Sequence, residues 1–357
     1  MENGITLHLE DAAGDAQANL LSRSAAAGIK RLLITHSKKN CDRDDIKELL
    51  CPLLQQGKAL NMEIILDVTP PLLEKLQLRE LAPSAFRMLG INGLRLSDDF
   101  SPQEIINFSR NHQGIRLLLN ASTMTGSKLT QLLDGQINLQ LVEAIHNFYP
   151  RPGTGLSEEF LVRKNILLHR AGLRIGAFVP ASPSGANNCN ASTLEEHRQE
   201  STDIAARHLI ALGIDFVFIG GSFPQDSALH ALGQLRESQV TMRAQWLTSN
   251  SFQRNLLQHT FTARADEARD AIRALEGQEL LAAAQGTITP DNDIIRPIGA
   301  ITIDNHTAGD YMGEIQLIRH PQGADSHVNV AAMVDEAEVN LLQYITPGRK
   351  FSFLFHD

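Results

Sequence analysis

The fold is best predicted from one stretch, Ile137-Asn-Leu-Gln-Leu-Val-Glu-Ala-Ile-His-Asn-Phe-Tyr-Pro-Arg-Pro-Gly-Thr-Gly-Leu-Ser157. Its first six residues, 137–142, form an apolar run that predicts a β-strand. A carboxylate, an imidazole, an amide, a phenol and a guanidinium then follow within nine residues. Polar groups gathered where a strand ends are typical of the active site of a (β/α)8 barrel. The prolines and glycines after them predict an irregular loop, and loops on rigid scaffolds often carry function.

Working outward from this stretch, β-rich runs recur eight times before about residue 220. They cover residues 5–9, 31–35, 63–68, 93–96, 115–120, 137–142, 173–179 and 215–219. Most are continuously apolar, as expected of parallel strands that are covered on both faces. Segments with helical spacing lie between them, at 42–56, 102–110, 157–171 and 193–212. Helix ends are expected at Gly28, Gly90, Gly172 and Gly213. Eight such units in about 240 residues predict a (β/α)8 TIM barrel, an α/β fold.

The pattern changes after about residue 239. Residues 240–247 predict a strand and residues 265–277 an amphipathic helix. Four more β-rich runs follow with no long helix between them, at 299–305, 311–319, 328–335 and 350–355, and they predict a mostly antiparallel sheet or small barrel. Because 357 residues exceed the usual size of one domain, we expect a barrel over 1–238 and a β domain over 239–357.

Composition and charge limit the kinds of partner and the compartment that we expect for this protein. The net charge is −9 and there is no long basic run, which argues against nucleic acid and against an anionic membrane surface. Three cysteines are scattered without metal-like spacing, which suits a reducing compartment. The N-terminal residues lack the features of a signal peptide, and no apolar run has the length of a membrane span. We therefore expect a cytoplasmic protein. The sequence leaves room for a homo-oligomer.

Polar side chains stand at several expected strand ends, where a barrel meets its substrate. In chain order these positions are Glu10, His36, Asp67, Asp98 with Asp99, Asn120, Glu143 with His146 and Asn147, Pro180 and Gly220. Carboxylates occur at several of them. A pair of carboxyl groups across a pocket is what glycoside hydrolysis requires, because one protonates the leaving oxygen and the other stabilises or attacks the anomeric carbon.

Most of these residues also have a structural explanation. Glu10 and His36 could be ordinary loop residues. Asp67 could close an Asx-turn, and Asp98 or Asp99 could cap the helix that follows. A structural role is hardest to find for the glutamate at 143, which follows an apolar run and precedes a polar cluster.

Two further positions bear on an anionic ligand. Gly220-Gly221 follows the last expected barrel strand, where barrels often bind phosphate on backbone N–H groups, although the same pair also suits a plain turn. Arg151 could bind a phosphate or carboxylate, or it could pair with Glu158.

The stretch 143–157, quoted at the start, closely resembles the signature of a bacterial family once described as outer surface proteins. That family is tied to 6-phospho-N-acetylmuramidase, a glycoside hydrolase. In the first two thirds the likeness extends to Leu66-Asp-Val-Thr-Pro70, Gly93-Leu-Arg-Leu96, Leu119-Asn-Ala-Ser-Thr123, Thr193-Leu-Glu-Glu-His-Arg198 and Val217-Phe-Ile-Gly220. In the last third it includes Arg264-Ala-Asp-Glu-Ala-Arg269, Thr302-Ile-Asp-Asn305, Gly313-Glu-Ile-Gln-Leu317 and Tyr344-Ile-Thr-Pro-Gly-Arg-Lys-Phe351.

The resemblance implies a (β/α)8 barrel followed by a small cyclophilin-like β-barrel domain. It also implies a cytoplasmic enzyme of cell-wall (peptidoglycan) recycling, which cleaves the β-1,4 bond of 6-phospho-N-acetylmuramic acid–N-acetylglucosamine. The chain departs from the family pattern in two places. Ser97 stands where the family usually has Asp, and the segment 181–190 lacks the arginine of the family's Gly-rich loop.

These observations together predict a phosphosugar glycosidase that needs neither metal nor organic cofactor. The predicted catalytic carboxyl groups are Glu143, then Asp67, then Asp98. Sugar and anion contacts are expected from Glu10, His36, Asn120, His146, Asn147, Tyr149, Arg151 and Gly220. An acetamido-assisted route with a single acid is an alternative. A barrel aldolase or epimerase is a rival, although no lysine stands at a strand end for a Schiff base. An inactive sugar-phosphate-binding regulator is the non-enzymatic rival.

Overall fold

The computed structural model describes residues 1–9, 15–36, 46–78, 80–181, 191–221, 224–235 and 239–357. The chain divides into two compact units, one of Met1–Leu209 with Gly213–Glu237 and the other of Ile210–Leu212 with Ser238–Asp357.

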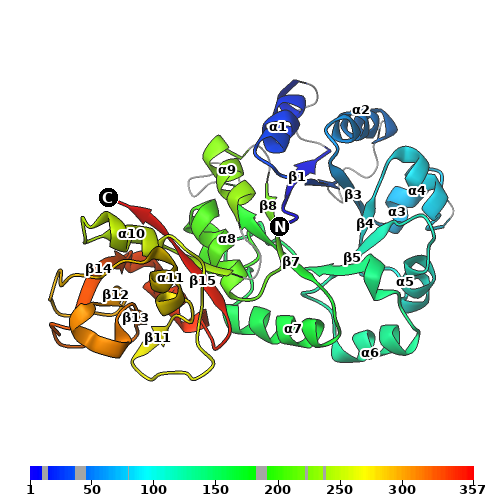
Figure 1. Cartoon of the computed structure of the whole chain (residues 1–357). Helices are drawn as coiled ribbons and strands as arrows, with labels where there is room; N and C mark the ends of the chain where they lie inside the picture. Colours follow the sequence, from blue (N-terminus) through cyan, green and yellow to red (C-terminus); the bar gives the residue numbers. More distant parts are fainter. Residues whose placement is uncertain (10–14, 37–45, 79, 182–190, 222–223, 236–238) are drawn as a thin grey trace. The chain divides into compact units, whose positions relative to one another are not determined.

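The first unit is a closed barrel of eight parallel strands in sequential order, which confirms the predicted fold (Figure 1). Its strands are β1 (Gly4–His8), β2 (Arg31–Thr35), β3 (Glu63–Val68), β4 (Gly93–Leu96), β5 (Arg116–Asn120), β6 (Val142–Ile145), β7 (Ile175–Pro180) and β8 (Phe216–Gly220). The barrel closes where β1 pairs with β8.

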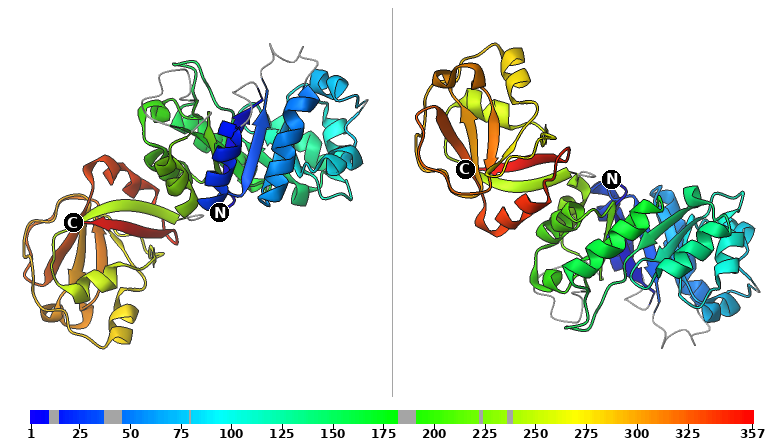
Figure 2. Two further views of the ribbon diagram at one scale, coloured as in Figure 1. Left: turned by 90° about the horizontal axis from the view of Figure 1, so that it is seen from above. Right: turned by 90° about the horizontal axis from the view of Figure 1, so that it is seen from below.

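Helices enclose the barrel strands, as the views of Figure 2 show. They are α1 (Asp15–Ala26), α2 (Ile46–Ala59), α3 (Pro70–Lys75), α4 (Pro83–Leu89), α5 (Pro102–Ser109), α6 (Gly126–Asp134), α7 (Glu158–Arg170), α8 (Thr202–Ala211) and α9 (Asp226–Gln234). Local signals set their ends. For example, α5 starts at a capping box between Ser101 and Glu104, and α4 ends at Gly90 in a left-handed conformation with φ of 85°.

An apolar layer fills the middle of the barrel. It is made of Leu33, Ile65, Leu118, Ile145, Phe178, Phe216 and Phe218. Small residues make room for its large rings, since a Cβ on Gly4 would lie 2.2 Å from the Phe218 ring and one on Gly176 would lie 2.0 Å from the Phe216 ring. This packed layer separates the N-terminal end of the barrel from its C-terminal mouth.

The sixth strand differs from the prediction. Residues 137–142 were expected to form it, but Leu139–Leu141 is a short 3₁₀ helix and β6 begins at Val142. Asn138 starts that turn, because its side chain accepts a hydrogen bond from the Gln140 N–H. The expected helix over 193–212 is also divided, into a 3₁₀ segment (Glu196–Gln199) and α8.

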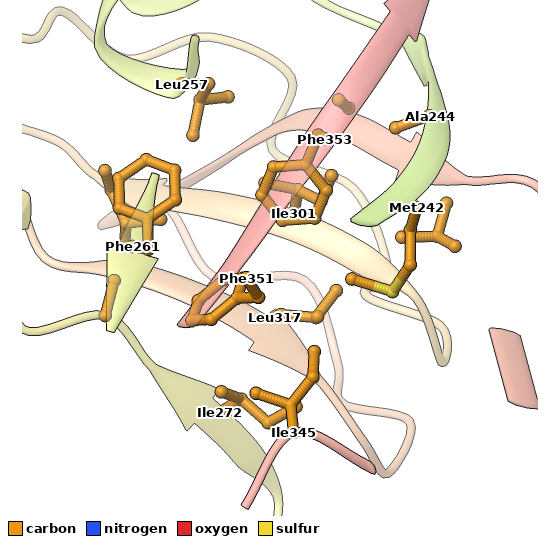
Figure 3. Packing of buried hydrophobic residues seen from close by; sticks show 14 of the residues in the cluster. Met242, Ala244, Leu257, Phe261, Ile272, Ile301, Leu317, Ile345, Phe351 and Phe353 are labelled. Atoms are coloured by element: carbon orange, nitrogen blue, oxygen red, sulfur yellow. The ribbon is translucent and has the colours of Figure 1, made fainter. Parts of the chain in front are cut away.

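The second unit is built on a seven-stranded sheet in the order β10-β15-β9-β14-β12-β13-β11. Its strands are β9 (Gln239–Trp246), β10 (Phe261–Thr262), β11 (Ala271–Arg273), β12 (Ala300–Asp304), β13 (Ile315–Ile318), β14 (Val328–Val334) and β15 (Lys350–His356). All neighbouring strands pair antiparallel except β9 and β15. Figure 3 shows the apolar core, in which Phe261, Phe351 and Phe353 pack around Ile301 and Leu317.

The prediction of an amphipathic helix over 265–277 is wrong. Part of that segment is β11, which pairs with β13. Charged residues in and next to the segment form local ion pairs, Arg264 with Asp266 and Arg269 with Asp270. The unit also contains α10 (Ser251–Leu257), α11 (Gly277–Ala284) and 3₁₀ segments at His306–Tyr311 and Glu336–Tyr344.

Candidate functional site at the barrel mouth

A polar cavity opens at the C-terminal end of the barrel. Its volume is ≈ 250 Å³, and its lining comes from the ends of strands β2 to β6. The lining residues are His36, Asp67, Thr69, Arg95, Leu96, Ser97, Asp98, Asp99, Asn120 and Asn147. The cavity therefore brings together five residues predicted from the sequence as site residues: His36, Asp67, Asp98, Asn120 and Asn147.

Arg95 organises one side of the cavity. Its Nη1 lies 2.8 Å from Asp67 Oδ2, and its Nη2 donates to Asn147 Oδ1 at 2.5 Å. One guanidinium thus links the ends of β3 and β6. The sequence prediction missed Arg95, although an arginine within the apolar run 93–96 was a usable signal, because a mostly buried cation needs an anionic partner.

Asp98 occupies the other side. Both of its carboxylate oxygens accept from the Thr123 hydroxyl at 2.9 Å, and Asn120 Nδ2 donates to Oδ2 at 2.8 Å. Lys128 Nζ is 3.9 Å away. The side chain remains 48% exposed, so it is accessible to a ligand in the cavity. The alternative that Asp98 caps the next helix does not hold, because Ser101 is the cap of α5.

A buried hydrogen-bonded chain supports the mouth from behind. His146 Nε2 lies 3.0 Å from Asn165 Oδ1, and its Nδ1 lies 3.3 Å from the Ser122 hydroxyl, which accepts from the Asn147 N–H at 3.0 Å. Burial lowers the pKa of His146 to about 4, although the hydrogen bond to Asn165 opposes this shift. His146 was predicted as a sugar contact, but in the structure its ring is fully buried and helps to hold Asn147 in place through Ser122.

Glu143 does not lie at the mouth, which corrects its predicted position. Since β6 begins at Val142, Glu143 is near the start of the strand rather than beyond its end. Its Oε2 lies 2.5 Å from Arg31 Nη2 and its Oε1 lies 3.3 Å from Arg174 Nη1. Arg31 is the first residue of β2 and also pairs with Glu63, the first residue of β3, at 2.8 Å.

These charges form a layer at the N-terminal end of the barrel. Its members are Glu2, Arg31, Glu63, Arg116, Glu143 and Arg174. The side chain of Arg31 is only 1% exposed, and that of Glu143 7%. Burial acts to lower the pKa of Arg31, but the nearby charges of Glu143 and Glu63 outweigh it and raise that pKa. Residues at this end of a barrel usually serve stability.

The other predicted residues lie on loops. Tyr149 is half-buried and pairs through its backbone with Ser192, whereas Arg151 is exposed. Gly220 ends β8, where a Cβ would lie 2.4 Å from the Ala191 carbonyl oxygen, so the close approach of that loop requires glycine. Glu10 lies outside the described residues, as do 182–190 and 222–223.

Within the part of the chain that the structure describes, no group of three or more His, Cys, Asp or Glu side chains is arranged to hold a metal ion. The same residues contain no helix that is both long and apolar enough to cross a membrane.

The fold and the mouth together define a barrel of the enzyme type, with acids, amides and an arginine at the C-terminal ends of its strands. Comparison with known families gives a more specific result. The chain belongs to the 6-phospho-N-acetylmuramidase family, whose N-terminal model matches residues 3–234 and whose C-terminal model matches residues 240–354. The family name points to a muramidase-like glycoside hydrolase.

Two crystal structures are similar over nearly the whole chain. One is an uncharacterized B. cereus protein, with 26% identity, coverage of 99% of this chain and 100% of that one, and a TM-score of 0.80. The other is a conserved Enterococcus faecalis protein of unknown function, with 26% identity, coverage of 100% and 97%, and a TM-score of 0.66. No curated protein matches the chain.

Proposed function

We propose that this protein is a cytoplasmic glycosidase of peptidoglycan recycling that hydrolyses the β-1,4 bond of 6-phospho-N-acetylmuramic acid–N-acetylglucosamine. The observation that carries the proposal is the mouth cavity, which gathers two supported carboxyl groups and several sugar-binding side chains in a family named for this activity. Arg, Asn and Asp side chains are suited to the hydroxyl, acetamido and acidic groups of such a sugar.

Asp67 and Asp98 are the proposed catalytic carboxyl groups. Both line the cavity, and each is oriented by neighbours, Asp67 by Arg95 and Asp98 by Asn120 and Thr123. Hydrolysis of a glycoside needs one group that protonates the leaving oxygen and a second that stabilises or attacks the anomeric carbon. In an acetamido-assisted variant of the reaction, one of the two would instead orient the acetamido group of the substrate.

The remaining site residues have proposed binding roles. Asn120, Asn147 and His36 contact sugar hydroxyls or the acetamido group from the cavity lining. Arg151, with Tyr149 beside it, binds an anionic substituent, which is the 6-phosphate or the lactyl carboxylate. Gly220 would add a main-chain donor to the anion site. Glu10 is proposed as a further substrate contact because it follows the first barrel strand in the sequence.

The second unit is proposed to be the cyclophilin-like β domain of the family, over residues 239–357. Its seven-stranded sheet and the match of the C-terminal family model to 240–354 support this assignment.

Hydrolysis by purified protein tests the proposal. Incubation with the 6-phosphorylated disaccharide should release both monosaccharides, which mass spectrometry and a reducing-sugar assay detect, and the unphosphorylated disaccharide should react more slowly. Asp67→Asn and Asp98→Asn should each lower turnover at least about a hundredfold, the scale of acid–base catalysis. Binding without release would instead favour a regulator, and a phosphosugar rearranged with its glycosidic bond intact would favour an epimerase.

A further inference from the structure

Two loops at the barrel mouth are fastened to each other. The first is the β6–α7 loop, 147–156, which carries Tyr149 and Arg151. The second is the segment 191–198, which leads to α8. Backbone hydrogen bonds join them at Tyr149 N to Ser192 O, Leu156 N to Thr193 O and Glu195 N to Leu156 O, over 2.9 to 3.0 Å.

Arg198 binds the first loop through its carbonyl groups. Its Nη1 donates to the oxygens of Tyr149 at 3.0 Å and Pro150 at 3.4 Å, and its Nη2 donates to the oxygen of Arg151 at 3.2 Å. The same guanidinium holds both oxygens of Glu195 at 2.8 Å. A planar group with five donors is suited to this task, because one rigid fork serves three successive carbonyls and a carboxylate.

Glu195 binds the amide groups of the same loop. Its Oε1 accepts from the Gly153 N–H at 2.8 Å and its Oε2 from the Gly155 N–H at 2.6 Å. The hydrogen bond from Arg198, assisted by these two amides, lowers the pKa of Glu195 to about 2. A Cβ on Gly155 would lie 2.7 Å from the Glu195 backbone nitrogen, so only glycine permits the approach. The pair Glu195–Arg198, which we call the loop clasp, therefore fixes residues 149–155 from both sides.

The clasp does not engage the side chain of Arg151. Arg151 is exposed, and among the described residues its side chain makes neither a hydrogen bond nor an ion pair, including none with Glu158. Because the backbone of this loop is held firmly, the position from which the Arg151 side chain extends is fixed before a ligand arrives, which reduces the ordering cost of binding.

We propose that Glu195 and Arg198 are positioning residues that present Arg151 to the anionic substituent of the sugar. This inference rests on the proposed function of Arg151. Arg198 would not touch the ligand, and it would act only through the conformation of the loop.

Equilibrium binding tests the inference without requiring turnover. The probes are N-acetylmuramic acid 6-phosphate, N-acetylglucosamine 6-phosphate, N-acetylmuramic acid and neutral N-acetylglucosamine, measured by calorimetry. Arg198→Ala should raise Kd about tenfold for the sugars with the anion that Arg151 binds, and leave Kd for neutral N-acetylglucosamine within about twofold. N-acetylglucosamine 6-phosphate and N-acetylmuramic acid each carry only one anionic group, so they show whether that anion is the phosphate or the carboxylate.

A double-mutant cycle separates positioning from general stability. If Arg198 acts through Arg151, then Arg151→Ala/Arg198→Ala should bind no worse than Arg151→Ala. Arg198→Lys should recover only part of the affinity, because an ammonium cannot replace the fork. Hydrogen exchange of residues 147–156 in Arg198→Ala checks that this substitution loosens the loop and leaves the amides of the barrel strands protected.

Arg207→Ala is the matched control. Arg207 is a buried arginine of α8 that pairs with Asp203 at 2.9 Å, and its loss should change all four affinities equally. Additive effects of the Arg151 and Arg198 substitutions, or an equal loss for all four sugars in Arg198→Ala, would overturn the positioning role. Unchanged binding in Arg151→Ala would overturn it as well. Failure of the hydrolase proposal would appear separately, as absence of product from the wild-type protein.

Discussion

Replacing Glu143 by Gln should lower stability and spare the chemistry. The substitution keeps the size of the side chain but removes its charge from a site where the carboxylate faces Arg31 at 2.5 Å and Arg174 at 3.3 Å. Arg31 would then be a buried cation with one anionic partner fewer. Breaking a buried ion pair in this way commonly costs about 3–5 kcal/mol.

We expect a value near the lower limit, about 3 kcal/mol, because Arg31 retains Glu63 at 2.8 Å. For a unit of this size each kcal/mol lowers Tm by about 2–4 °C, which predicts a fall of roughly 6–12 °C in the transition of the barrel. Turnover measured well below that transition should stay within about threefold of wild type, because the apolar layer separates Glu143 from the mouth.

Thermal unfolding and steady-state kinetics on the same preparation test this prediction. Glu63→Gln is the graded comparison, since Glu63 is more exposed than Glu143, and it should cost less stability. The reasoning would be refuted by a Glu143→Gln variant that unfolds like wild type and loses turnover a hundredfold or more.

Three further predictions concern other groups. Arg95→Lys should lower kcat/KM about a hundredfold in the hydrolysis assay, because Lys cannot bridge Asp67 and Asn147, and near-normal kinetics would argue against that bridge. Burial, with help from the charges of Glu314 and Asp325, raises the pKa of Asp304 from 3.8 to about 7. The contribution of Asp304 to the stability of the second unit is therefore complete below pH 3.8 and is lost as the pH rises through about 7. Asp304→Asn should therefore stabilise the second unit by about 2–4 kcal/mol above pH 7, and denaturant unfolding that shows the same pH slope in both proteins would contradict this. The pKa of His146 is lowered from 6.5 to about 4, so the contribution of this residue to barrel stability is present above pH 6.5 and is lost as the pH falls through about 4. An NMR titration should therefore show no step for this ring near pH 6.5.

The barrel could be predicted because its strands are buried on both faces. The largely apolar runs 31–35 and 63–68 mark strands that agree with the structure to the residue. The run 137–142 misled because apolar content alone does not distinguish a strand from a turn, and Asn138 starts a 3₁₀ helix there. The segment 265–277 misled because its first residues are irregular, with ion pairs between near neighbours, and its middle joins the sheet as β11.

The site was predicted only in part, since strand ends were inferred from these boundaries. Asp67 and Asn120 were placed correctly because β3 and β5 were. The sixth strand was expected to end at residue 142, but β6 begins there. Glu143 was therefore predicted at the C-terminal mouth, whereas it lies at the N-terminal end of the barrel. Charged residues at the starts of other strands, Arg31 and Glu63 among them, were a signal for the charged layer that encloses it. The loop clasp could not be foreseen, because its partners are 40 or more residues apart in the sequence and meet only in the folded barrel.

A crystal structure of the Asp98→Asn variant with bound 6-phospho-N-acetylmuramic acid–N-acetylglucosamine tests the central claim most directly. The account predicts that the glycosidic oxygen lies in the mouth cavity, within hydrogen-bond distance of position 67 or 98, and that Glu143 remains paired with Arg31 on the far side of the apolar layer. A disaccharide bound elsewhere, with neither carboxyl position near its glycosidic bond, would contradict the account.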